Sequence, residues 1–132
     1  MPAKPTRQQR AEADWCHNSA GPDATRCPVR TTTNLLGGKW KLLLLAYLSN
    51  GPHRYGELRR LVPEISEKML IQELRALETD GLVQRTVFQT VPPRVEYALV
   101  GPGVALRPVV AALLEWGMGY VQRDRAAGAA SG

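Results

Sequence analysis

Apolar side chains recur with two different periods along the chain, and the change of period separates predicted helices from predicted strands. From residue 28 to residue 80 they recur every three or four positions, which is typical of helices that bury one face. From residue 83 to residue 99 they alternate with polar positions, which is typical of half-buried strands. Signals such as Gly37-Gly38 and Asn50-Gly51-Pro52 end the helical segments. The pattern predicts helices over 28–36, 39–49, 54–61, 67–80 and 104–125, and strands over 83–88 and 94–99.

The order of these elements predicts the fold class. The two short helices joined by Val62-Pro63-Glu64-Ile65 are a helix-turn-helix candidate. The hairpin that follows them directly, with the proline-containing loop 89–93, is in the place of a wing. The final helix has an apolar face that is wider than one small domain needs. We therefore expect an α+β fold that is mostly α: a winged helix-turn-helix with a two-stranded wing and a long C-terminal helix.

The two ends of the chain lack this patterning. Residues 1–25 are rich in Pro, Arg, Gln, Ala and Gly and sustain no apolar period, which predicts a flexible N-terminal tail. Residues 125–132 are mostly Ala and Gly, which predicts a disordered C-terminal end. The sequence therefore predicts one ordered domain over residues 26–124.

The predicted helix 67–80 has two chemically different sides. At about 100° per residue, Lys68, Gln72 and Arg75 share one side, and three leucines take the opposite side. Arg can bond two acceptors of guanine, Gln can pair with adenine, and Lys can reach guanine or phosphate. Exposed helix faces often carry such residues without any role, but this one belongs to the second helix of a helix-turn-helix. We therefore expect it to lie in the major groove of DNA.

The remaining DNA-binding candidates lie at the start of this helix and in the wing. Ser66 is a good N-cap residue, and the helix N-terminus after it favours a phosphate. Met69 lies in the same first turn. Arg94, at the tip of the predicted hairpin, can enter the minor groove or contact phosphate; the alternative is a surface residue paired with a nearby acid. The expected DNA-binding residues are Ser66, Lys68, Met69, Gln72, Arg75 and Arg94.

Composition agrees with a DNA-binding protein and gives no sign of an enzyme. The 132 residues carry a net charge of +5, which mildly favours an anionic partner. The sequence has no catalytic triad, phosphate-binding loop or metal-ligand cluster, and two Cys and two His are a poor set for structural zinc. The basic N-terminus leads into no apolar signal-peptide core, and no uninterrupted apolar run approaches a membrane span. We expect a cytoplasmic non-enzyme with no cofactor, no metal and no membrane partner.

Three spaced motifs resemble one family of regulators. They are Cys-Pro at 27–28, Gly-Gly-Lys-Trp at 37–40 and Pro-Pro-Arg-Val-Glu-Tyr at 92–97. Together with the segments around them, they resemble the HxlR-type winged-helix regulators, relatives of the MarR group. The resemblance implies a homodimer that binds double-stranded DNA, with the terminal helix as a dimerisation helix. Many such proteins are repressors.

The chain departs from the family pattern in two places. Val100-Gly101-Pro102-Gly103 stands where a Thr-type cap usually opens the last helix. His53 stands where Lys or Arg is common, which weakens one expected phosphate contact. Neither departure touches the face of the 67–80 helix.

Cys27 has two interpretations. In some relatives the cysteine of the Cys-Pro motif senses oxidants, quinones or aldehydes, and here Arg26 and Arg30 flank it next to a predicted helix N-terminus. Both features lower a thiol pKa. The other interpretation is a small buried thiol that packs at the dimer contact. The sequence leaves open both this choice and the identity of any small-molecule or oxidant effector.

A second class of function is also open at this stage. A winged-helix domain can serve as a protein-interaction module without sequence-specific DNA binding. In that case Lys68, Gln72 and Arg75 would tolerate substitution, and DNA binding that depends on salt would be absent. The sequence does not give the operator or the target genes.

Overall fold

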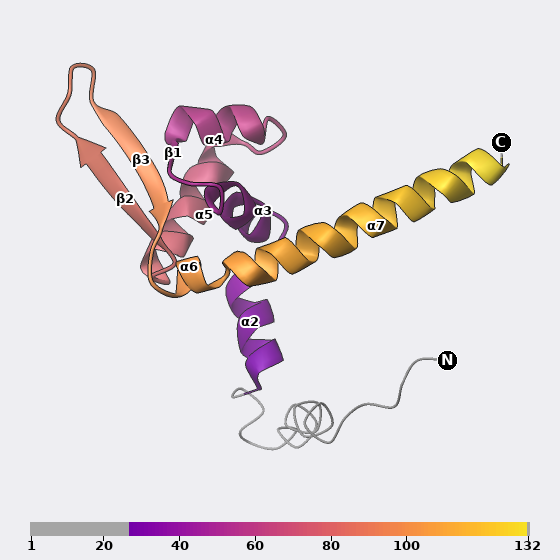
Figure 1. Cartoon of the computed structure of the whole chain (residues 1–132). Helices are drawn as coiled ribbons and strands as arrows, with labels where there is room; N and C mark the ends of the chain where they lie inside the picture. Colours follow the sequence, from indigo (N-terminus) through magenta and orange to yellow (C-terminus); the bar gives the residue numbers. More distant parts are fainter. Residues whose placement is uncertain (1–26, 132) are drawn as a thin grey trace. The chain divides into compact units, whose positions relative to one another are not determined.

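The computed structural model describes residues 27–131, and its elements carry the labels of Figure 1. The predicted tail, with Cys16, lies outside the described residues. The chain divides into two units, residues 1–38 and residues 39–132. In the first unit, α2 spans Pro28–Leu36, as predicted, with Pro28 in its first turn. Cys27, the residue before it, and Leu36 at its end are both buried.

In the second unit, three helices form the centre of the core. α3 spans Lys41–Leu48, α4 spans Tyr55–Leu61, and α5 spans Glu67–Thr79. α3 is apolar on nearly every side, as a central helix should be. Each of the three helices contributes leucines to the core, and these leucines have almost no solvent exposure. They are Leu44, Leu45, Leu48, Leu58, Leu70, Leu74 and Leu77.

The sheet has three antiparallel strands in the order β1-β3-β2. β2 spans Val83–Phe88 and β3 spans Arg94–Leu99, as the alternation predicts. β1, His53–Arg54, is an additional strand that the sequence did not predict, and it pairs with Tyr97 and Glu96 of β3. A two-residue strand is too short to show any period in the sequence. It forms because it can pair with the edge of β3.

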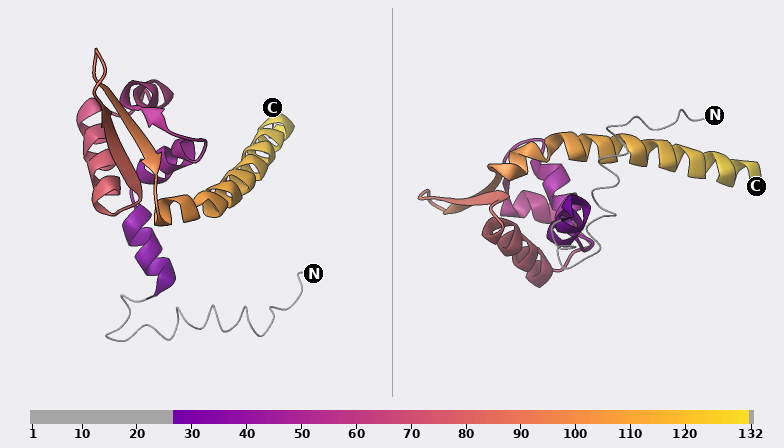
Figure 2. Two further views of the ribbon diagram at one scale, coloured as in Figure 1. Left: turned by 60° about the vertical axis from the view of Figure 1, so that its left-hand side comes forward. Right: turned by 90° about the horizontal axis from the view of Figure 1, so that it is seen from below.

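One face of the β2–β3 hairpin enters the core at its base and leaves it toward the tip. Val83 and Leu99 are register partners and are buried, and so is Tyr97 in the next row. Val87, farther along the same face, is exposed. Figures 1 and 2 show the hairpin projecting beyond α4 and α5. The wing therefore has an anchored base and a free end.

The predicted last helix is divided in two. α6 spans Pro102–Ala105, and α7 spans Arg107–Ser131. No side chain caps α6; Gly101 precedes it with a φ of 49°, which favours glycine, and Pro102 occupies the first turn. A Cβ at Gly103 would collide with the backbone carbonyl of Leu82, so the chain needs glycine there to pack α6 on the start of β2. The two glycines and the proline thus replace the missing Thr-type cap.

α7 continues well past the predicted end of the helix. The structure describes residues 125–131, where the sequence predicts a disordered end, as part of this helix. Alanine is the strongest helix former, and the Ala-rich end extends a helix that has already nucleated.

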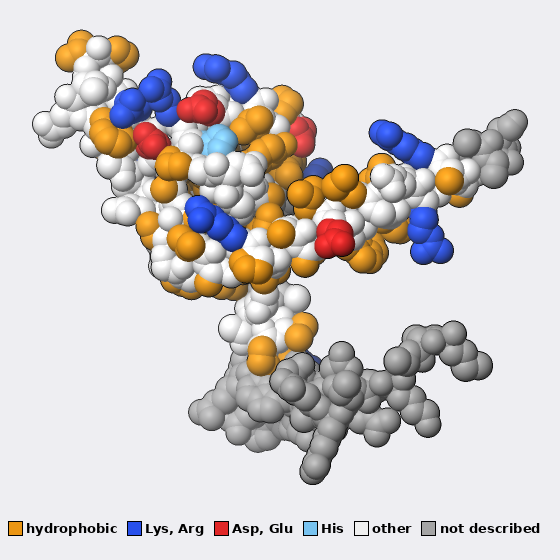
Figure 3. All heavy atoms as spheres, in the orientation of Figure 1, with side chains coloured by type: hydrophobic (Ala, Val, Ile, Leu, Met, Phe, Trp, Pro, Cys, Tyr) orange, Lys and Arg blue, Asp and Glu red, His pale blue; other side chains and the backbone are white. Residues whose placement is uncertain are grey.

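Most of α7 has no cover. Figure 3 shows hydrophobic side chains along its surface, where Leu114, Trp116 and Tyr120 are each more than half exposed. The stretch Pro102–Gly128 is long and apolar enough to cross a membrane. A single helix that meets these two criteria is weak evidence for a membrane span. These exposed residues belong to the apolar face of the last helix, which the sequence predicted to be wider than one domain needs.

Candidate nucleic-acid interface

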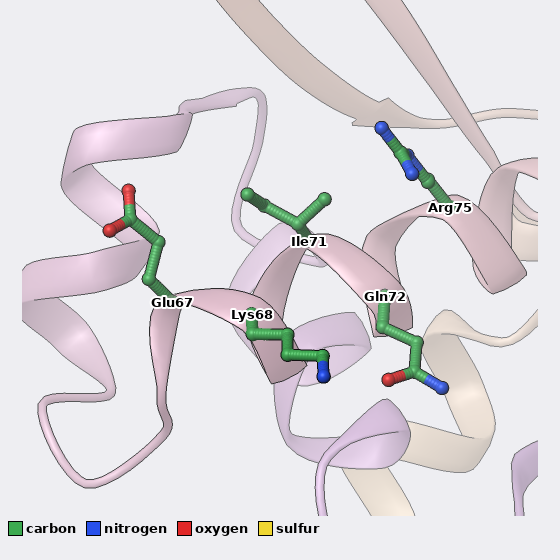
Figure 4. A pocket seen from close by; sticks show the side chains of 5 residues that line it. All are labelled: Glu67, Lys68, Ile71, Gln72 and Arg75. Atoms are coloured by element: carbon green, nitrogen blue, oxygen red, sulfur yellow. The ribbon is translucent and has the colours of Figure 1, made fainter.

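The exposed side of α5 carries the residues that were predicted to read DNA. Lys68, Gln72 and Arg75 are exposed, and the leucines opposite them are buried. Figure 4 shows Lys68 and Gln72 extending to one side of the helix and Arg75, with Ile71, to the other. With Glu67, these four residues line a shallow hollow on the surface. The helix thus offers two cations, an amide and an apolar side chain over about two turns.

The start of α5 is capped as expected. The hydroxyl of Ser66 accepts a hydrogen bond from the backbone N–H of Met69 at 3.1 Å. This bond satisfies one of the free N–H groups of the first turn and holds the helix start in place. The Ser66 hydroxyl is therefore committed to the helix, and the Met69 side chain is partly exposed beside it.

A second hollow lies between α5 and the sheet. Arg75 and Ile71 line it from α5, and Tyr97 and Arg85 line it from the strands. Arg85 is exposed and faces the same hollow as Arg75, although it was not among the predicted site residues. The alternation placed Arg85 on the inward face of β2, where a charge is unexpected, and this was the signal that could have identified it.

Glu67, the first residue of α5, is held by two side chains from α4. The hydroxyl of Tyr55 donates to Oε1 of Glu67 at 3.2 Å, and Nη1 of Arg59 lies 3.7 Å from Oε2. Burial is the main cause that raises the pKa of Tyr55, the carboxylate of Glu67 adds to it, and Arg59 opposes it. Tyr55 therefore stays protonated and remains a donor. Arg59 is engaged with Glu67.

Arg94 does not lie at the tip of the wing. It is the first residue of β3, paired in register with Phe88, and its guanidinium lies 4.3 Å from the centre of that ring. Its Nε lies 3.8 Å from a carboxylate oxygen of Glu96, an ion-pair distance that is too long for a hydrogen bond. The tip, residues 89–93, carries no charge. The sequence predicted Arg94 at the tip, but the five residues of the proline-containing loop form the tip and Arg94 pairs within the sheet.

Other basic residues of the described chain have different surroundings. Arg54 lines a third hollow together with Arg94 and the wing loop. Lys39 lies 4.7 Å over the ring of Trp40. Nδ1 of His53 lies 2.8 Å from the carbonyl oxygen of Gly51, so this ring is tied to the backbone. Of these, Arg54 is the cation that joins the wing side of the surface.

Cys27 lies in the first unit and is 2 % exposed. It immediately precedes α2, whose Thr31 N–H bonds to the Cys27 carbonyl at 2.9 Å. The burial fits the interpretation as a packed thiol.

These features define a class of protein: α4, the turn and α5 are a helix-turn-helix, and β2–β3 is its wing. Among residues 27–131 there is no group of three or more potential metal ligands. The chain belongs to the HxlR-like helix-turn-helix family, whose family model matches residues 35–125. The resemblance noted in the sequence is confirmed, and so is the fold class. The chain is a DNA-binding transcriptional regulator of the helix-turn-helix type.

Individual relatives agree with this assignment. The HTH-type transcriptional regulator YkvN of Bacillus subtilis is 46% identical over 102 residues, which cover 77% of this chain and 86% of that protein. YtfH of Escherichia coli, also named as an HTH-type transcriptional regulator, is 43% identical over 93 residues, covering 70% of this chain and 74% of that protein. These names describe regulators and not enzymes.

A solved structure with the same fold is the redox regulator HypR in its oxidized form. It has 45% sequence identity and a TM-score of 0.67, over 70% of this chain and 96% of that chain. The reduced form of the regulator YodB from B. subtilis has 36% identity and a TM-score of 0.61, over 68% of this chain and 89% of that one.

Proposed function

We propose that this chain acts in the cytoplasm as a homodimer that binds a specific double-stranded DNA site and represses transcription there. The observation that carries the proposal is the exposed side of α5, where Lys68, Gln72 and Arg75 lie opposite buried leucines. In a helix-turn-helix, the second helix enters the major groove.

Each side chain on this surface has a proposed role. Arg75 bonds guanine, Gln72 pairs with adenine, and Lys68 contacts guanine or phosphate. Ser66 and Met69 approach the DNA through the first turn of α5, where backbone N–H groups and the helix dipole favour a phosphate. On the wing side, Arg85 and Arg94 neutralise phosphates of the same duplex.

The spacing of apolar residues on α7 supports a homodimer. Val109, Leu113, Trp116 and Tyr120 follow one another at intervals of four, three and four residues, which is the spacing of a coiled-coil seam. All four are exposed, and the rings of Trp116 and Tyr120 stack at 5.3 Å. A second copy of the same helix has the matching stripe. Two copies would present two α5 helices to successive major grooves, about one turn of DNA apart.

The test is binding of the purified protein to the intergenic DNA next to its own gene. Arg75→Ala should weaken the specific site by about 1–3 kcal/mol and relax the base preference. Arg60→Ala removes the same charge from exposed α4, outside the hollows of the reading surface, and should leave the base preference unchanged. Equal loss on specific and random duplexes for Arg75→Ala would contradict its role as a base reader.

We also propose that Cys27 makes DNA binding sensitive to oxidants or electrophiles. The likeness to a protein named a redox regulator supports this, as does the position of Cys27 directly before a helix N-terminus. Diamide, peroxide or a quinone should then change the operator affinity of the wild type. An identical response from Cys27→Ser would contradict the proposal.

A further inference from the structure

The DNA-reading side of α5 begins with a carboxylate, which a surface built for phosphate alone would exclude. We propose that Glu67 determines specificity by accepting a hydrogen bond from the N4 amino group of a cytosine in the operator. The inference rests on the proposed function, in which α5 lies in the major groove.

The position of Glu67 supports a contact with a base. It is the first residue of α5, and N-terminal residues of a recognition helix contact base edges. Its side chain is 62% exposed, although two neighbours hold it. It lines the hollow of Lys68 and Gln72 as well as the hollow of Arg75 and Arg85. The carboxylate thus lies among the residues that are proposed to face the groove.

The anchoring of Glu67 makes it a directed acceptor. Tyr55 donates to one oxygen, and Arg59 approaches the other. Both anchors come from α4, so they hold the side chain against the neighbouring helix. A carboxylate offers about four acceptor positions, and these two contacts leave further positions for a ligand. An acceptor held in this way has lost side-chain freedom before DNA binds, which lowers the entropic cost of a specific contact.

The chemistry selects one base. An ionised carboxylate accepts hydrogen bonds and donates none. In the major groove, guanine N7 and O6 and thymine O4 are acceptors, so they repel it. Adenine offers an amino group next to the acceptor N7, whereas cytosine offers its N4 amino group without that acceptor. Phosphates also repel the carboxylate, so Glu67 lowers the affinity for DNA that lacks a cytosine at this position.

The test is selection from a randomised duplex library, followed by affinity measurements on single-base variants of the selected site. Glu67→Gln should reduce the preference for cytosine at one position in each half-site by about 10-fold and shift it toward adenine, because an amide can pair with N6 and N7. Binding to random duplexes should become a few-fold tighter, and the slope of log K against log salt steeper by up to about 1.

Two further variants separate base reading from simple charge. Glu73→Gln removes the same charge from a part of α5 outside these hollows, and should leave the base profile unchanged. Glu67→Asp keeps the charge but shortens the side chain, so it should lose the preference for cytosine while it keeps the wild-type salt slope. Tyr55→Phe removes the hydroxyl that positions Glu67 and should reduce the same preference by a smaller factor.

The outcomes are distinguishable. If Glu67→Gln and Glu67→Asp keep the wild-type base profile, Glu67 is a brace between α4 and α5 and the inference is wrong. If Glu67→Gln fails to fold, Tyr55→Phe and Glu67→Asp decide in the same way. If the wild type binds no duplex at all, the proposed function itself fails. If the wild type selects bases through Arg75 alone, this inference fails and the proposed function stands.

Discussion

The helix-turn-helix with its wing and the C-terminal helix α7 treat their apolar side chains in opposite ways. In the former, leucines such as Leu58, Leu70 and Leu77 are completely enclosed. In α7, Leu114 and Trp116 are 63% and 69% exposed. At about 25 cal/mol per Å² of apolar surface removed from water, burial stabilises the first region, whereas the exposed side chains of α7 would gain this stabilisation only where a partner covers them. Under the proposed function, the first region holds the DNA-reading surface and α7 holds one half of the dimer interface.

The largest expected effect comes from changing the exposed stripe of α7. Leu113→Glu combined with Trp116→Glu places charges in the proposed seam, where each would lose its hydration in a dimer. We expect a monomer by size-exclusion chromatography with light scattering. Operator affinity should fall by about 10²–10⁴-fold, because the two half-sites no longer act together.

The control carries the same charges on another side of the helix. Ala111 and Gln122 are exposed and lie about 160–220° around α7 from Leu113. Ala111→Glu combined with Gln122→Glu should leave both the dimer and the operator affinity intact. A wild-type protein that is monomeric at the concentrations used for DNA binding would remove the basis of the comparison.

The next prediction compares how tightly the core and α7 are packed, by replacing one glycine with alanine in each region. Gly103→Ala forces a Cβ against the carbonyl of Leu82 and should lower the free energy of unfolding by about 1–3 kcal/mol. Gly119→Ala lies on α7, where no atom is within 4 Å of the added Cβ, and should be neutral or stabilising by up to about 1 kcal/mol. Urea unfolding at one protein concentration measures both. Equal destabilisation by the two variants would show that α7 is packed as tightly as the core.

The smallest effect concerns single cations in the two regions. Arg94→Ala should weaken binding evenly across DNA sequences and reduce the magnitude of the slope of log K against log salt by about 0.9 for each protomer of the bound dimer. Arg123→Ala removes an exposed cation from α7 and should leave the slope unchanged, because the proposed dimer places α7 at the partner and not at the duplex. Fluorescence anisotropy over a range of salt concentrations measures both. A change of base preference in Arg94→Ala would contradict a phosphate contact.

Most of the fold could be predicted because local patterns specify it. The two sides of α5 differ so clearly that Leu70 and Leu74 had to face the core, and the alternation in β2 and β3 gave the correct faces of the hairpin. α6 and its separation from α7 could not be predicted, because the break depends on contact between Gly103 and Leu82, which lie 21 positions apart. The end of α7, where the sequence predicts a disordered segment, is helical up to Ser131, which agrees with the high helix propensity of alanine.

The part of the candidate site that lies within one helix could be predicted in the same way. Periodicity alone brought Lys68, Gln72 and Arg75 together, since residues three and four apart share a helix face. It could not bring Arg85 to the hollow beside Arg75, or Tyr55 and Arg59 to Glu67, because these groups come from separate elements. Arg94 moved from the tip of the wing to the ring of Phe88 for a related reason: strand register decides which residues are neighbours.

The sequence by itself determined most of the helices, the two strands of the wing, and which face of each is apolar, because these follow from side-chain spacing over a few residues. The tertiary structure decided which charged groups meet and which apolar face remains uncovered. Those outcomes depend on contacts between residues far apart in the chain. The leucines of the core bury their apolar surface against one another, whereas those of α7 have no such neighbours in the described chain.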